Sequence, residues 1–367
     1  MNTILTKPLF KLLILIIVLF YCLSVPTLSG KGVNSGMTGN SLAWADDAKG
    51  QTCVDMAGRT VRVKGKATRV VTTFKPATLF MMTLGLQDLL AGIDTPSKND
   101  LISRALIPDI DTIPGVGSKD SGINLETIIS IAPDLVILFA QKNGISMADR
   151  LSAMDIPSVV IFPETFENIR QTLRLMATAI GAPERSVSVE QEMDAILDRV
   201  GAVVATLPAK NRKTGYFASP RGLFNTAPGT LLQDELFARA GIINVAHDMN
   251  GYFQDISPEQ FTQWNPDMVF LSRKLGDHAL KQLDNPAFKT VTAVKTGAVY
   301  RFPSDITPWD FPSPLSTLAI LWLADKAYPE HFHGMDIPGL IDGFHTRLFG
   351  KSLTELSTAL NLPPGTN

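Results

Sequence analysis

Two segments far apart in the chain share one pattern of apolar and polar positions. The segments INLETIISIAPDLVIL (123–138) and ISPEQFTQWNPDMVFL (256–271) align without a gap. In the first segment the capping residue Asn124 precedes apolar residues at helical spacing; in the second, Ser257 is the cap and Pro258 takes the first helical position. A proline, Pro133 or Pro266, then ends the helix, and a short apolar run follows. The pattern predicts that each copy is a helix leading into a buried strand.

Short apolar runs alternate with helical spacing along the rest of the chain. They occupy residues 69–74, 158–163, 213–219 and 297–303. Strands that alternate with helices favour α/β layering with parallel sheets. Because the repeated segment occurs twice, we expect two lobes of similar plan.

The segment between the two predicted lobes has no strand signal. From Ser186 to Leu207 the apolar residues recur every three or four positions, which is typical of an amphipathic helix. We therefore predict an α/β fold in which two Rossmann-like lobes are joined by a single long helix, with a cleft between strand-end loops. The expected divisions are a signal peptide at 1–45, an N-terminal lobe at 46–165, an interlobe helical segment at 166–208, a C-terminal lobe at 209–350 and a tail at 351–367.

The first residues have the features of an export signal. Lys7 and Lys11 precede a long apolar run, and Ala43 and Ala45 form an A-x-A cleavage site. An uncleaved membrane anchor is the alternative, because the run approaches the roughly 20 residues that a span requires. Both interpretations place the bulk of the chain in the periplasm, and the second leaves it tethered to the membrane. After cleavage Cys53 has no cysteine partner for an internal disulfide.

Composition narrows the class of protein further. With 45% apolar and 19% charged residues among 367, the chain is typical of a globular protein. Its net charge of −2 argues against a nucleic-acid partner. The chain contains no G-x-S-x-G, H-E-x-x-H or G-x-x-x-x-G-K-[ST] motif, so we do not expect an enzyme. The predicted first lobe has no histidine, which disfavours a bare metal site shared by the two lobes.

Several motifs together resemble a known family, the periplasmic solute-binding proteins of ABC importers for ferric siderophores, haem and cobalamin. The resemblance covers residues 53–350 and rests on VDMAGRTVRVKGKATRVVTT, LGLQDLLAGI, GVGSKDSGINLETIISIAPDLVIL, WNPDMVFL, AVKTGAVYRFP and WDFPSPLSTLAILWLADKAYPEHF. The segment VKGKATR departs from the family, in which a proline usually precedes the arginine. The resemblance implies a monomer without a cofactor of its own. Such a monomer captures an iron–siderophore, haem or corrinoid chelate between its lobes and delivers it to a permease dimer with its ATPase.

The resemblance also gives the repeated segment a function. In the family, an acid at the start of a helix on each lobe docks onto arginines of the permease, and the matching residues here are Glu126 and Glu259. Similar acids on two lobes suit a two-fold symmetric partner. The alternative is that each acid only stabilises the dipole of its own helix.

Charged and aromatic residues in the predicted strand-end loops are the candidate ligand contacts. The cations are Lys75, Lys119, Lys142, Arg221 and Arg273, and the rings with polar groups are Tyr252 and Trp309. A cleft lined by cations would attract an anion, and rings could pack against a planar chelate. The alternative for each of these residues is an ordinary place on the surface or in the core.

Two other functions stay open at this point. A tetrapyrrole metal chelatase is also a two-lobed α/β protein, and it would need a histidine and a carboxylate deep in the cleft; His247 and Asp248 are the candidates. A binding protein of the same fold could instead take an oxyanion such as molybdate or tungstate.

Overall fold

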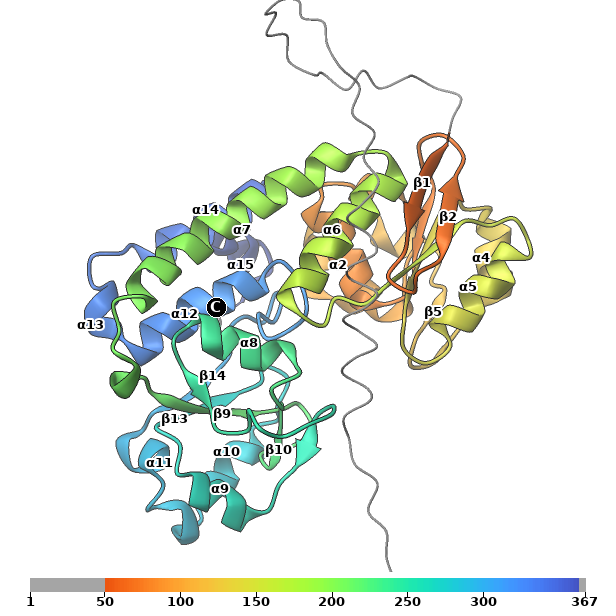
Figure 1. Cartoon of the computed structure of the whole chain (residues 1–367). Helices are drawn as coiled ribbons and strands as arrows, with labels where there is room; N and C mark the ends of the chain where they lie inside the picture. Colours follow the sequence, from red (N-terminus) through yellow and green to blue (C-terminus); the bar gives the residue numbers. More distant parts are fainter. Residues whose placement is uncertain (1–49, 363–367) are drawn as a thin grey trace, which may run out of the picture. The chain divides into compact units, whose positions relative to one another are not determined.

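The computed structural model describes residues 50–362 of the chain (Figure 1). The predicted signal peptide at 1–45, and the anchor that is its alternative, lie outside the described residues. Across 50–362, no helix combines the length and the apolar character needed to cross a membrane.

The first lobe is built on a four-stranded parallel sheet with the strand order β4-β3-β7-β8. Every residue of β7 and β8 is buried, as expected for parallel strands that are covered on both faces. The strands are β3 (Val70–Thr72), β4 (Leu90–Gly92), β7 (Leu135–Phe139) and β8 (Ser158–Ile161), and the hairpins are β1 (Gln51–Val54) with β2 (Thr60–Val63) and β5 (Gly117–Ser118) with β6 (Gly122–Ile123). The helices of this lobe are α2 (Lys75–Thr83), α3 (Leu101–Leu106), α4 (Leu125–Ile131) and α5 (Gly144–Ser152).

The second lobe has a parallel sheet of the same size, in the order β11-β9-β13-β14. Its strands are β9 (Thr214–Ala218), β11 (Ile243–Asn244), β13 (Met268–Leu271) and β14 (Val299–Arg301), with a separate antiparallel pair of β10 (Asn225–Thr226) and β12 (Gln254–Asp255). Its helices are α8 (Leu232–Arg239), α9 (Pro258–Trp264), α10 (His278–Leu283), α11 (Thr292–Thr296), α12 (Ser316–Ala327), α13 (Pro329–Phe332) and α14 (Ile337–Phe349). The predicted α/β class with parallel sheets is confirmed.

The two copies of the repeated segment occupy matching settings. The Asn124 side chain accepts a hydrogen bond from the Thr127 N–H at 3.0 Å at the start of α4, and Ser257 accepts one from the Gln260 N–H at 3.1 Å at the start of α9. Each helix leads into an inner strand of its sheet, β7 or β13. The helix-to-strand unit predicted for both copies is therefore confirmed.

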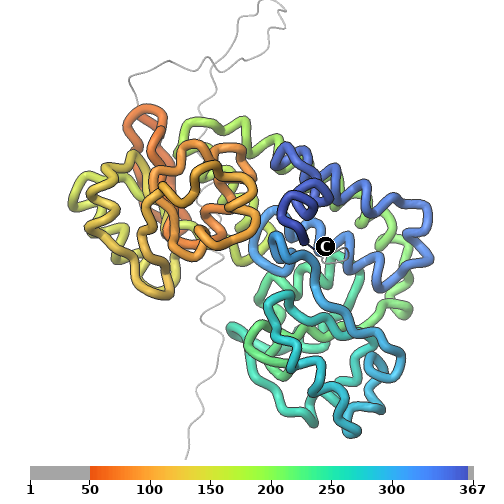
Figure 2. The backbone as a smooth tube through the Cα atoms, turned by 180° about the vertical axis from the view of Figure 1, so that it is seen from behind, coloured from red at the N-terminus to blue at the C-terminus, as the bar shows by residue number. Residues whose placement is uncertain are grey.

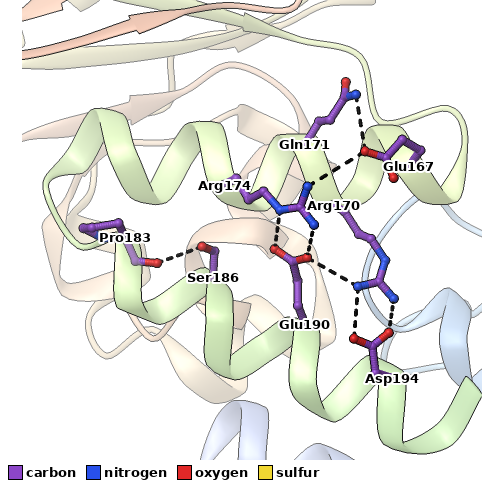
Figure 3. Close-up of polar contacts among 8 residues, drawn as sticks. All are labelled: Glu167, Arg170, Gln171, Arg174, Pro183, Ser186, Glu190 and Asp194. Carbon is purple, nitrogen blue, oxygen red and sulfur yellow. Dashed lines mark hydrogen bonds and ion pairs between the residues drawn. The ribbon is translucent and has the colours of Figure 1, made fainter. Parts of the chain in front are cut away.

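The interlobe segment consists of two helices, α6 (Phe166–Ile180) and α7 (Pro183–Val204). The chain reverses at Gly181, whose φ of 86° lies in the left-handed region that glycine adopts without strain. Ion pairs then join the two helices (Figure 3). Arg174 Nε donates to Glu190 Oε1 at 2.8 Å, Arg170 Nη1 lies 3.3 Å from Glu190 Oε2, and Arg170 also pairs with Asp194. The 22-residue α7 is the long helix that the apolar spacing predicts.

The C-terminal segment packs back onto the first lobe. We expected residues 351–367 to be a tail, but they include α15 (Leu353–Ala359), which begins with a capping box of Ser352 and Glu355. Helix α15 packs against α3, and α14 packs against α2 and α7, along the blue end of the tube in Figure 2. Arg347 pairs with Glu192 of α7, which adds a polar link. Helix α14 therefore supports the interlobe helix α7, while α15 packs on the first lobe.

Candidate functional site

A cleft of about 290 Å³ lies where the strand-end loops of the two sheets meet. In the first lobe its walls come from the ends of β3, β4, β7 and β8 and from the β5–β6 hairpin; in the second they come from β9, α8, the residues before β12 and residues 310–312. This is the edge at which open parallel sheets usually bind ligands.

Aromatic rings form much of both walls. Phe74 and Phe139 of the first lobe have ring centroids 4.8 Å apart. In the second lobe the centroids of Tyr252 and Phe253 are 5.0 Å apart, and Phe311 also lines the cleft. Tyr252 is 43% exposed, so much of its ring is accessible to a ligand. Rings presented from both sides offer apolar area that a bound molecule can cover.

Lys75 and Lys119 line the cleft, as the sequence predicts for both. Lys75 forms an ion pair with Asp100 of the same lobe. Lys119 Nζ lies 3.8 Å from Asp120 Oδ2 and 5.1 Å from the centroid of the Phe139 ring. Each lysine therefore already has an acidic neighbour within its own lobe.

The other four predicted ligand contacts are not among the residues of 50–362 that line the cleft. The Arg221 guanidinium carbon is 5.6 Å from the Tyr252 ring centroid, so Arg221 contacts a cleft residue without being part of the lining. Lys142 pairs with Asp120, and Arg273 Nε donates to Asp305 Oδ1 at 2.7 Å. Trp309 is buried. Of the seven predicted ligand contacts, the structure thus brings Lys75, Lys119 and Tyr252 together in the cleft.

Four acidic residues line the cleft: Asp94, Asp120, Glu164 and Asp310. The sequence predicts a lining dominated by cations, but in the structure the acids outnumber the two lysines. Asp120, Glu164 and Asp310 lie in predicted strand-end loops, so loop position was the available signal for these three. Asp94 follows β4, a strand that the sequence analysis did not predict. Asp94 and Asp310 are buried, Glu164 is partly buried and Asp120 is exposed, and these differences depend on packing that has no local signal.

Burial shifts the pKa of three of these acids upward. It raises the pKa of Asp94 even though Ser97 Oγ, at 2.6 Å, and Thr78 Oγ1, at 2.9 Å, donate to its carboxylate. It raises the pKa of Glu164, opposed by the charge of Lys119. It raises the pKa of Asp310 to about 6, although the Ser272 hydroxyl donates to Oδ2 at 2.5 Å. These shifts have the direction expected when a carboxylate loses its hydration.

A family model described as periplasmic binding protein matches residues 70–306. The chain belongs to this family. The match begins at β3 and ends after β14, so it includes both parallel sheets and the interlobe helices. The family expected from the sequence is confirmed.

Relatives and solved structures agree with this assignment. The chain is 23% identical to the molybdate-binding protein MolA of Haemophilus influenzae, over 67% of this chain and 75% of the relative. It is 25% identical to the Fe(3+)-citrate-binding protein YfmC of Bacillus subtilis, over 78% and 87%. The solved structure of MolA with molybdate superposes with a TM-score of 0.72 at 19% identity, covering 82% of this chain and 98% of MolA. A Helicobacter pylori CeuE structure with a Ni-His complex has a TM-score of 0.71 at 20% identity, covering 85% and 99%.

The two glutamates of the repeated segment are exposed on this periplasmic-binding fold. Glu126 and Glu259 lie in the first turns of α4 and α9. Hydrogen bonds from its own backbone N–H and from Ser257 lower the pKa of Glu259. This contact fits the helix-dipole interpretation, and the exposure of both side chains keeps docking open.

The residues suggested for a chelatase do not form the deep pair that such an enzyme needs. His247 is 65% exposed, and its Nδ1 lies 3.0 Å from Asp234 Oδ1 rather than against Asp248. The hydrogen bond with Asp234 raises the pKa of His247. Within 50–362, no three His, Cys, Asp or Glu side chains gather closely enough to hold a metal ion.

Proposed function

We propose that the protein is the periplasmic receptor of an ABC importer, which captures a small metal chelate in the cleft and delivers it to a permease dimer with its ATPase. The observation that carries this proposal is a cleft with aromatic walls from both lobes, in a chain of the periplasmic binding protein family. Clefts of this size and lining are typical of small-molecule sites.

The relatives support a ligand that contains a metal. MolA, YfmC and the CeuE structure are described with molybdate, Fe(3+)-citrate and Ni-His, ligands that differ in charge and shape but share a metal centre. We propose a chelate of the iron–siderophore, haem or corrinoid type. An oxyanion is the second candidate, which the likeness to MolA favours.

Lys75, Lys119 and Tyr252 are the proposed direct contacts, because they line the cleft. Arg221 would hold the Tyr252 ring in place through its cation–π contact. Lys142, Arg273 and Trp309 lie outside the lining, so contact with a ligand would require the loops that carry them to move.

The test is to purify the full chain from the periplasm of its own host and to measure its intact mass under native conditions, its metal content and its absorbance. We expect one metal-bearing molecule per monomer, and a mature chain that begins after Ala45 or, if the anchor is retained, an unprocessed one. Conversion of a porphyrin and a free metal into a metalloporphyrin would contradict the proposal and support the chelatase. A chain that carries no ligand and binds none of the candidate ligand classes would also contradict it.

A further inference from the structure

Acceptors outnumber donors among the charged residues of the cleft. Four carboxyl residues and two lysines line it. Lys75 is paired with Asp100, and Lys119 lies between Asp120 and the Phe139 ring. Because both lysines are already engaged, an entering anion would meet mainly carboxyl groups.

Asp310 combines burial with an unused acceptor atom. It is 5% exposed, and Ser272 Oγ donates to Oδ2. Backbone N–H groups of Arg273 and of Asp310 itself, and the charge of Lys274, also favour its ionised form. Even so, no hydrogen bond of good geometry reaches Oδ1 from any residue in 50–362. A buried carboxylate oxygen without a donor is unfavourable, and such atoms are rare in folded proteins.

The surrounding segment shows the same feature. Eight buried side-chain polar atoms in the described part of the chain have no hydrogen-bond partner, and five of them lie in residues 307–317. They belong to Thr307, Trp309, Asp310, Ser313 and Thr317. Of these five residues, Asp310 is the one that lines the cleft. The polar groups of this segment are thus incompletely satisfied by the protein, and the Asp310 carboxylate is the group among them that a ligand in the cleft can reach.

Glu164 presents a second carboxyl group to the cleft, from the first lobe. It follows β8, and within residues 50–362 its side chain makes no hydrogen bond or ion pair, although Lys119 interacts with it electrostatically. The cleft therefore has one carboxyl group with unused acceptor capacity on each lobe. A molecule held between the lobes can meet both.

We propose that Asp310, with Glu164 on the other lobe, accepts hydrogen bonds from donor groups of the ligand, so that the cleft selects a neutral or positively charged chelate over an oxyanion. This inference rests on the proposed function and specifies the charge class of its ligand. Hydrogen bonds to a carboxylate are stronger than those between neutral groups, whereas an oxyanion beside the same carboxylates is repelled. The aromatic walls also favour a positively charged ligand, because the face of an aromatic ring carries partial negative charge.

Calorimetric titrations of the full chain at pH 7.5 test this with three probes: nickel(II) bis-L-histidine, which is neutral, ferric citrate and molybdate. We expect the nickel complex to bind more tightly than molybdate. In Asp310→Asn the amide oxygen can keep the Ser272 hydrogen bond while an NH₂ group replaces Oδ1, so an acceptor becomes a donor. This variant should bind the nickel complex about tenfold more weakly. Asp325→Asn is the matched control, because Asp325 pairs with Lys326 on α12 outside the cleft.

The outcomes separate this inference from the function on which it rests. If the wild type binds molybdate more tightly than the nickel complex, or if Asp310→Asn binds the nickel complex as the wild type does, the inference is wrong and the receptor function stands. If the wild type binds none of the three probes and carries no ligand from its host, both are wrong. Should Asp310→Asn fail to fold, Glu164→Gln decides instead, since its side chain is partly exposed and its expected loss of affinity is similar.

Discussion

Asp134 and Thr68 are joined by two hydrogen bonds at the start of the first sheet. The Thr68 N–H and hydroxyl both donate to Asp134 Oδ2 at 2.8 Å. The second lobe repeats the arrangement, with Thr214 N–H and Oγ1 donating to Asp267 Oδ2 at 2.8 and 2.9 Å. Each aspartate follows the proline that ends the repeated helix, and each threonine lies at or just before the start of a neighbouring strand. The two copies thus also share the aspartate–threonine contact that joins the two inner strands of each sheet.

Replacing Asp134 by Ala should destabilise the protein by about 1 kcal/mol, because the Thr68 and Arg69 donors lose their acceptor. Asp267→Ala should have a similar effect in the second lobe. Urea denaturation followed by circular dichroism measures both. Thr68→Val, which removes one of the donors and keeps the shape, should cost less than Asp134→Ala. Equal stability of the wild type and both alanine variants would show that register is set by packing alone.

Glu190 should be the residue on which the α6–α7 contact depends most (Figure 3). It is 12% exposed and accepts from both Arg170 and Arg174. Glu190→Ala leaves the partly buried guanidinium of Arg170 and the more exposed guanidinium of Arg174 with fewer partners, so we expect a loss of about 1–2 kcal/mol in the free energy of unfolding. Glu167→Ala is the control: its carboxylate is 64% exposed and 3.9 Å from Arg174, and its loss should be below about 0.5 kcal/mol. A larger effect at Glu167 than at Glu190 would contradict this order.

Asp310 should make stability depend on pH in the opposite direction to a salt-bridged acid. Burial raises its pKa to about 6, so the folded protein favours the protonated carboxyl. Ionisation costs nothing below the unfolded pKa of about 4, and the full cost is present above about pH 6. Asp310→Asn should therefore be more stable than the wild type at pH 7.5, by up to about 3 kcal/mol, with the difference vanishing near pH 4. Thermal melts across this range measure it; a difference that grows toward low pH would contradict the assignment.

His345 should make the protein less stable as the pH falls, over nearly the same pH range as Asp310 and in the opposite direction. Burial lowers its pKa to about 4, and its Nδ1 lies 2.9 Å from the Ile341 carbonyl oxygen. The unfolded chain takes up a proton below about pH 6.5 and the folded chain does not, so stability falls as the pH drops from about 6.5 to about 4. His345→Gln should lose this dependence while Asp310→Asn keeps it. Parallel pH–stability curves for the wild type and His345→Gln would be the contrary result.

Reversing both repeated acids, in Glu126→Lys/Glu259→Lys, separates docking from helix stabilisation. If these residues dock onto the permease, uptake by cells should be lost while the affinity for ligand, measured by calorimetry, stays unchanged. Glu184→Lys is a matched control, because Glu184 is also an exposed acid in a first helical turn, that of α7. If only the helix dipole matters, all three positions should lower stability by about 0.3–1 kcal/mol each and uptake should persist.

The local elements could be predicted because their signals are local. Asn124 and Ser257 cap helices, Pro133 and Pro266 follow their ends, and the apolar spacing of α7 marks the face that packs in the core. These features depend on residues a few positions apart. Helical spacing did not predict α15 in the C-terminal tail; α15 begins with a capping box, and its position is set by packing against α3 and α14.

The sequence by itself determined the family, the repeated helix-to-strand unit and the loops from which a cleft would be built. Only the tertiary structure decided which side chains of those loops face one another. Trp309 and Asp310 are neighbours in one irregular loop, yet Trp309 is buried behind the wall and Asp310 lines the cleft. Lys142 is paired with Asp120 from another loop. Irregular segments have no repeating geometry, so the direction of each side chain is set by packing and charge from distant parts of the chain.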